Sequence, residues 1–141
     1  MAEQDVRTAD VALVVLARAA AVERAVARAL RGTDFGVPHW TVLAHLAAEG
    51  ATMAALAERT NLPAATLTRT VDKLVDRTLV HRSLDGHDRR RVVVRLTDRG
   101  AATLDELSGL VDAATAGALE GFEPWETQAL QGLLGRFDVS T

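Results

Sequence analysis

The sequence contains no cysteine among its 141 residues. A disulfide framework, a thiolate nucleophile and a thiol redox switch are therefore excluded. No stretch of about 18 apolar residues is free of charge, so no segment is expected to span a membrane. The first ten residues are polar and acidic, unlike a signal peptide, and a cytoplasmic location is expected.

Enzyme and metal-site motifs are also missing from the sequence. The chain has no nucleophile elbow, no glycine-rich phosphate loop, no HExxH sequence and no cluster of carboxylates with histidine. His81 and His87 stand alone, and no group of residues has metal-ligand spacing. The sequence therefore predicts no enzyme, no metal and no cofactor. Hydrophobic residues make up 48% and charged residues 25%, typical of one globular domain or two tightly joined lobes.

Basic residues are slightly outnumbered by acidic ones overall but are concentrated in one part of the chain. The formal net charge is −3, from 16 basic and 19 acidic residues. Residues 59–99 hold ten basic and five acidic residues, a local balance of +5, and the rest of the chain balances at −8. Fifteen of the sixteen basic residues are arginine, which reflects either a GC-rich genome or selection for phosphate contacts. The asymmetry favours a basic working surface on an acidic scaffold.

Hydrophobic repeats of three and four residues predict helices along most of the chain. Gly32 and Gly36 mark a loop, and Pro38 can open the helix that follows it. Thr52 is suited to cap a short helix, and Gly117 weakens the far end of a later one. The expected helices cover 6–30, 38–48, 53–60, about 64–77, 98–120 and a last segment after Glu123-Pro124.

Two of these helices form a helix-turn-helix unit, because only the short turn Asn61-Leu62-Pro63 separates them. A β-hairpin is expected next. Its strands are 79–82 and the β-branched segment 92–96, and residues 85–88 supply the turn. A hairpin directly after a helix-turn-helix is a wing. The buried stripe expected on the second helix consists of Leu67, Val71 and Leu74.

The terminal helices carry apolar stripes and have little to pack on except each other or a second copy, so a homodimer is expected. The fold class is mainly α with a two-stranded β-wing. A winged helix-turn-helix lobe spans 35–100, and a helical dimerisation lobe combines 1–34 with 101–141. The residues expected at the dimer interface are Leu13, Leu16, Leu107, Val111, Leu130, Leu133, Leu134 and Phe137.

The chain resembles the MarR family of transcriptional regulators over residues 35–135. Asp85-x-x-Asp88-x-Arg90, a short apolar strand and Leu96-Thr97-x-x-Gly100 match the family's wing signature. Thr66-Leu67-Thr68-Arg69 resembles the start of its recognition helix, and Trp40-Thr41-Val42-Leu43 resembles the helix before the helix-turn-helix. The order and spacing of these segments make the resemblance strong.

Three residues depart from the family pattern. Thr78 stands where the family usually has glycine after the recognition helix, which implies strain or a different helix end. Pro63 stands near the usual N-cap serine, so that cap is missing or shifted. Thr70 replaces a residue that is commonly apolar. These departures affect local geometry rather than the fold.

The resemblance implies that Arg90 inserts into a DNA minor groove and that Asp88 braces it by an ion pair, while the recognition helix enters the major groove. Arg69 could read guanine or hold a phosphate. The alternative is that these arginines only form a solvated surface. The expected DNA-contacting residues are Ala65, Thr66, Thr68, Arg69, Lys73, Arg82, Asp88, Arg89, Arg90 and Arg91.

The resemblance also implies a small aromatic or phenolic anion as effector, bound between the two lobes. Trp40 could instead be core packing, and the histidines near it ordinary surface residues. The absence of cysteine excludes the branch of the family that senses peroxide with a reactive thiol. The expected effector-pocket residues are Arg18, His39, Trp40 and His45.

The function expected from the sequence is a dimeric regulator that binds a palindromic operator in double-stranded DNA, acts as a repressor and is released by the effector. The alternative is a winged-helix protein for architectural or partner contacts, with no specific operator or effector. Discrimination between DNA sequences separates the two hypotheses.

Overall fold

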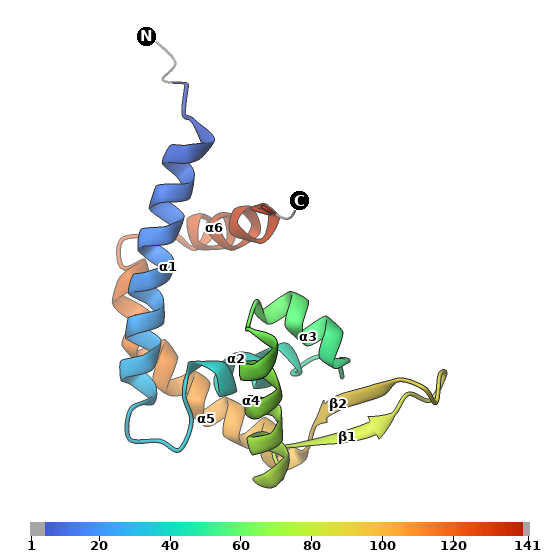
Figure 1. Ribbon diagram of the computed structural model, residues 1–141. Coiled ribbons are helices and arrows are strands. Elements are labelled where there is room, and N and C mark those ends of the chain that lie inside the picture. The colour runs from blue at the N-terminus through green and yellow to red at the C-terminus, as the bar shows by residue number, and fades with distance from the viewer. Residues whose placement is uncertain (1–4, 140–141) are drawn as a thin grey trace.

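Within residues 5–139, which the computed structural model describes, the chain forms six α-helices, one 3₁₀ helix and one two-stranded antiparallel sheet (Figure 1). Residues 1–4 and 140–141, the outer ends of the expected dimerisation lobe, lie outside the described residues. The expected fold class is confirmed. The elements are α1 (Thr8–Leu30), α2 (Val37–His45), α3 (Met53–Thr60), α4 (Ala64–Asp76), β1 (Val80–Leu84), β2 (Val92–Leu96), α5 (Asp98–Thr115), η1 (Ala116–Leu119) and α6 (Pro124–Arg136).

Two helices end earlier than expected. α2 stops at His45 rather than at residue 48, because the chain leaves the helix to pair Ala51 with Val94 of β2. The Ala51 amide donates to the Val94 carbonyl at 3.0 Å, and the reverse bond measures 2.8 Å. α5 ends at Thr115 rather than at residue 120. Gly117, which was expected to weaken the end of this helix, lies in the 3₁₀ helix that follows.

One hydrophobic core joins the helix-turn-helix to α1 and α5. The expected stripe of α4 is buried, and it belongs to the same cluster as residues from α1 and α5. Thr70 is only 4% exposed, but its hydroxyl donates to the Thr66 carbonyl at 2.7 Å, so the departure at this position leaves no unpaired polar group. The principal contributors are Val26, Leu30, Leu43, Leu67, Val71, Leu74, Leu104, Leu107 and Val111.

Leu107 and Val111, which were expected at the dimer interface, are buried within a single protomer. These side chains are only 3% and 6% exposed in a single protomer, where α5 packs against α1 and α2. They therefore offer almost no surface to a second copy. Periodicity indicates that a helix face is buried, but it does not indicate which element buries it.

The remaining interface candidates lie on exposed surface. Among the described residues, α6 has no buried position, and Figure 1 shows it set apart from the helix-turn-helix and the wing. Such an apolar helix face, left open in one protomer, is available to a partner. The exposed candidates are Leu13, Leu16, Leu130, Leu133, Leu134 and Phe137.

Candidate nucleic-acid interface

The outer face of α4 carries the first candidate DNA contacts. Ala65, Thr68 and Arg69 are exposed, and Thr66 is half-buried. The guanidinium of Arg69 has no ion-pair partner within residues 5–139, whereas the Thr68 hydroxyl donates to the Ala64 carbonyl at 3.0 Å. The helix face opposite the buried stripe thus carries small side chains around one unpaired positive charge, the guanidinium of Arg69.

Pro63 and Thr78 mark the two ends of this helix. Pro63 occupies the N-cap position and provides no side-chain cap, as its departure from the family pattern implied. Thr78 has a φ of +58°, in the left-handed region. Its amide donates to Val75 and the Leu79 amide donates to Leu74, both at 2.9 Å, which is a Schellman helix end. A β-branched residue in this conformation is strained.

The base of the wing is fixed by a close backbone approach. A Cβ atom added to Gly100, in the first turn of α5, would lie 1.9 Å from the Leu79 carbonyl oxygen. Only glycine leaves room for this contact. The Thr97 hydroxyl donates to the Thr78 carbonyl at 2.7 Å and adds a second link. The matched Leu-Thr-x-x-Gly signature therefore sets the angle between wing and recognition helix.

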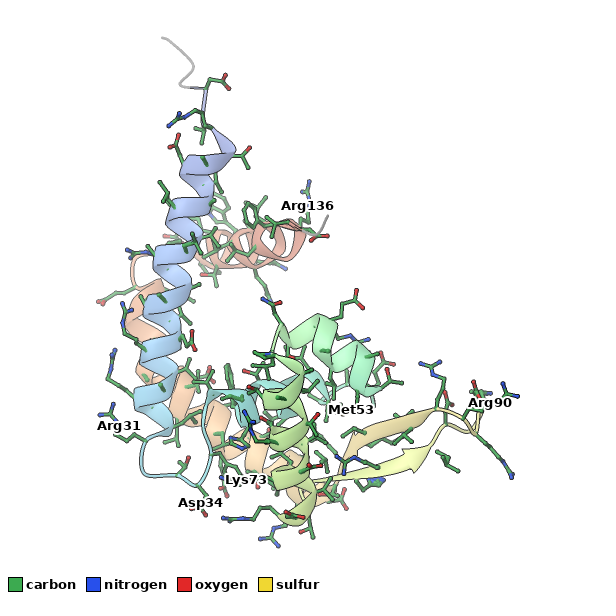
Figure 2. All side chains as sticks on the ribbon, viewed as in Figure 1. Arg31, Asp34, Met53, Lys73, Arg90 and Arg136 are labelled. Atoms are coloured by element: carbon green, nitrogen blue, oxygen red, sulfur yellow. The ribbon has the colours of Figure 1, made fainter. Side chains whose placement is uncertain are left out.

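The wing projects away from the rest of the protomer, with Arg90 at its tip (Figure 2). β1 and β2 pair from Val80 opposite Leu96 to Leu84 opposite Val92. Beyond the strands, the Asp85 amide donates to the Arg91 carbonyl at 2.8 Å and closes the tip. β1 is two residues longer at its tip end than expected, so the arginine-bearing turn lies further from the core.

The expected ion pair between Asp88 and Arg90 is not formed. Instead, the Asp88 carboxylate accepts the backbone N–H of Arg90 at 3.0 Å and so holds the turn. The ion pair at the tip joins Arg91 to Asp85 at 3.9 Å. The pKa of Asp85 is lowered, mainly because its carboxylate accepts the His87 N–H and also because Arg91 lies near it. The guanidiniums of Arg89 and Arg90 remain unpaired within residues 5–139.

Arg82 and Lys73 have partners inside the chain. Arg82 lies 2.6 Å from the Asp72 carboxylate, which ties the wing to the recognition helix. Lys73 donates to the Asp34 carbonyl and lies 5.5 Å from the centre of the Phe35 ring. Figure 2 shows Lys73 directed toward the loop that carries Asp34. In the free protomer both cationic groups are thus paired within the chain, and the phosphate contact expected of each stays a prediction.

No pattern in the sequence predicted that α4 would contact the loop of Asp34 and Phe35. Arg77 forms an ion pair with Asp34 at 3.0 Å and lies 5.9 Å from the centre of the Phe35 ring. These contacts join α4 to a loop about forty residues earlier in the chain. The helical period already places the Asp72 carboxylate on the exposed face of α4. Its ion pair with Arg82 could not be predicted, because it depends on the path of the wing.

Three of the four candidate effector residues have hydrogen-bond partners outside the candidate set. No hydrogen bond, ion pair or ring contact among residues 5–139 joins any two of them. The Trp40 indole donates to the Ser108 hydroxyl at 3.0 Å, and the His45 ring is 2.8 Å from the Thr41 carbonyl. Arg18 is exposed on α1, whereas the buried residues of that helix, Val26 and Leu30, lie toward its C-terminal end.

His39 has a local structural role. Its Nδ1 accepts the Gly36 amide at 3.0 Å, and its ring meets Phe35 edge-on with centroids 5.8 Å apart. Burial lowers the pKa of His39, and the charge of Lys73 lowers it further. The folded state therefore favours the neutral form of the His39 ring.

The described part of the chain has no metal or membrane signature. No three His, Asp or Glu side chains gather there as a possible metal site. No helix within it combines the length and apolar character needed to cross a bilayer. The fold, with exposed cations on α4 and the wing, is that of winged helix-turn-helix proteins, a class typical of DNA binding.

Comparison with known proteins agrees with this class. A model of the MarR family matches residues 33–91. CouR from Rhodococcus jostii RHA1, solved with p-coumaroyl-CoA, is 29% identical, with a TM-score of 0.78 over 93% of this chain and 96% of that one. A MarR-family regulator from Rhodococcus sp. RHA1 is 28% identical, with a TM-score of 0.76 over 93% and 94%.

A third structure supports the fold alone. BpsR from Bordetella bronchiseptica, whose DNA binding is regulated by 6-hydroxynicotinic acid, is 23% identical, with a TM-score of 0.71 over 89% of this chain and 96% of that one. The wing signature, the family match over residues 33–91 and these likenesses agree in showing that the chain is similar to MarR-family transcriptional regulators.

Proposed function

We propose that this protein is a homodimeric repressor that binds a palindromic operator and is released by a small aromatic anion. The observation that carries the proposal is the pair of unpaired, exposed arginines on two elements held at a fixed angle. Arg69 lies on the recognition helix and Arg90 at the wing tip, while the Arg82–Asp72 ion pair joins the two elements. Binding to chromosomal DNA would place the protein in the cytoplasm.

The exposed apolar surface of the terminal helices supports the dimer. Leu16 on α1 is 67% exposed and Leu133 on α6 is 61% exposed, which is unfavourable for large apolar side chains in water. Pairing two copies through these helices would remove that surface from water and relate the copies by a two-fold axis. Two recognition helices held about 34 Å apart would then match half-sites one helical turn apart.

The small-molecule effector is supported by the relatives. CouR was solved with p-coumaroyl-CoA, and 6-hydroxynicotinic acid regulates the DNA binding of BpsR. An aromatic anion is therefore the ligand class proposed for this chain. Its site would lie between the lobes of the dimer, near Arg18, His39, Trp40 and His45. A ligand that prefers a different spacing of the lobes lowers DNA affinity by its differential affinity for the two states.

Selection of bound sites from a random duplex library tests this function. Affinities for the winning duplex and a scrambled duplex are then measured over a range of salt concentrations. A palindromic winner bound at least about a thousandfold more tightly than scrambled DNA is the expected result. Equal affinities with equally steep salt dependence would contradict it and favour the architectural alternative. The winning duplex also serves as the probe in a screen of aromatic acids.

A further inference from the structure

A cleft of about 280 Å³ lies between the wing and the start of α3, away from the outer face of α4. Two stretches distant in sequence form its walls: the loop before α3 with α3 itself, and the wing turn with β2. The paired backbone bonds of Ala51 and Val94 hold the loop against β2. Figure 2 shows Met53, the first residue of α3, close to the strands of the wing.

The cleft collects more positive than negative charge. Arg59, Arg91 and Arg95 line it, against Glu49 and Asp85. Arg91 is the arginine paired with Asp85. Within residues 5–139, Arg59 and Arg95 have neither an ion pair nor a side-chain hydrogen bond, and Glu49 does not neutralise them by pairing. The charge of Arg95 contributes to the lowered pKa of Asp85, and the three arginines still exceed the two carboxylates by one charge, which favours an anion in the cleft.

The side chain of Arg95 lies against the backbone of Gly50. A Cβ atom on Gly50 would lie 2.7 Å from Cγ of Arg95 and 3.0 Å from one of its terminal nitrogens. The side chain therefore lies flat on Gly50, in space that any other residue would occupy. A guanidinium positioned before its ligand arrives loses less conformational entropy on binding.

We propose that this cleft is an oxyanion site that takes a phosphate group between Arg59 and Arg95. Guanidinium groups bind phosphate oxygens through paired, charge-assisted hydrogen bonds. The phosphate belongs either to the DNA backbone, between the grooves reached by α4 and the wing, or to a free phosphorylated small molecule. The first source rests on the proposed function, whereas the second does not require DNA binding.

Calorimetric titration of the full chain with sodium pyrophosphate, at constant ionic strength, tests the free source. Arg59→Ala and Arg95→Ala should each weaken pyrophosphate binding by about tenfold or more, as expected for one lost charge-assisted contact. Arg24→Ala is the matched control, because it removes the same charge from an exposed position on α1. Melting curves of the three variants should coincide with that of the wild type, since all three side chains are exposed.

Affinity for the selected duplex over a range of salt concentrations tests the DNA source. If a backbone phosphate occupies the cleft, Arg95→Ala should reduce the slope of log affinity against log salt by about 0.9 per protomer relative to Arg24→Ala. Either selective effect supports the site and identifies its source. The proposal is overturned if neither assay separates Arg59→Ala and Arg95→Ala from Arg24→Ala. A wild-type protein that binds no DNA would refute the proposed function, and the pyrophosphate arm alone would then decide on the site.

Discussion

Replacing Arg90 with alanine removes a guanidinium from the tip of the wing (Figure 2). In the free protein this guanidinium has no ion pair, and the backbone N–H that donates to Asp88 is retained by alanine. Arg90 is also exposed, so the free energy of unfolding should change by no more than about 0.5 kcal/mol. A change in DNA affinity would therefore report the DNA contact itself.

The expected loss follows from the number of arginines that contact one operator. An arginine contact to DNA contributes about 1–3 kcal/mol. A dimer loses two such contacts, or about 2–6 kcal/mol, which corresponds to at least about a thirtyfold weaker Kd. Insertion into a narrow minor groove predicts a larger loss on A·T-rich flanks, where the negative potential is strongest.

Fluorescence anisotropy with a labelled selected duplex measures this loss, and Arg24→Ala again controls for net charge. Light scattering should show the same oligomeric state for both variants. A Kd for Arg90→Ala within about threefold of the Arg24→Ala value, that is within about 0.7 kcal/mol, would refute the insertion of Arg90.

Three further predictions concern stability and assembly. Thr78→Gly should stabilise the fold by about 1 kcal/mol, because relief of left-handed strain outweighs the entropy of glycine, and a lower Tm would contradict this. Leu133→Asp should leave a folded monomer, whereas Leu107→Asp should lose helical circular dichroism, since only Leu107 is buried in one protomer; light scattering that finds Leu133→Asp still dimeric would refute this assignment of the interface. Because the pKa of His39 is lowered in the fold, the unfolded chain binds more protons as the pH falls below 6.5, and stability should fall there. His39→Gln can keep the cap at Gly36 and should weaken this pH dependence in urea titrations, and an unchanged profile would exclude His39 as its source.

Local features were predictable because their causes are local. The apolar repeat of Leu67, Val71 and Leu74 has the helical period, so the sequence specifies which face of α4 is buried. The turn at Asn61 was also predictable, and Asn61 adopts the left-handed conformation that ends α3. The arginines of the wing turn were located by a motif whose spacing does not depend on the rest of the fold.

Features that depend on distant segments were not predictable. Leu107 has the same local pattern as a coiled-coil residue, but α1 and α2 of its own protomer cover it. Lys73 lies at a position suited to a phosphate contact, yet its ammonium group donates a hydrogen bond to the Asp34 carbonyl, 39 residues earlier in the chain. The cleft at Gly50 and Arg95 exists only because the Ala51–Val94 bridge brings the loop to β2. Hydrophobic periodicity predicts which face of a helix is buried, whereas the element that packs on this face depends on the path of the whole chain.

The spacing of half-sites gives the most direct test of the central claim, that two copies present their recognition helices together to one operator. The measurement compares the Kd for the selected duplex with that for the same duplex carrying about half a helical turn, roughly five base pairs, inserted between its half-sites. The account predicts that the insertion lowers affinity to nearly that of scrambled DNA, because the second half-site rotates away from the dimer. Equal affinity for the two duplexes would contradict a dimer with fixed spacing and indicate that each protomer binds alone.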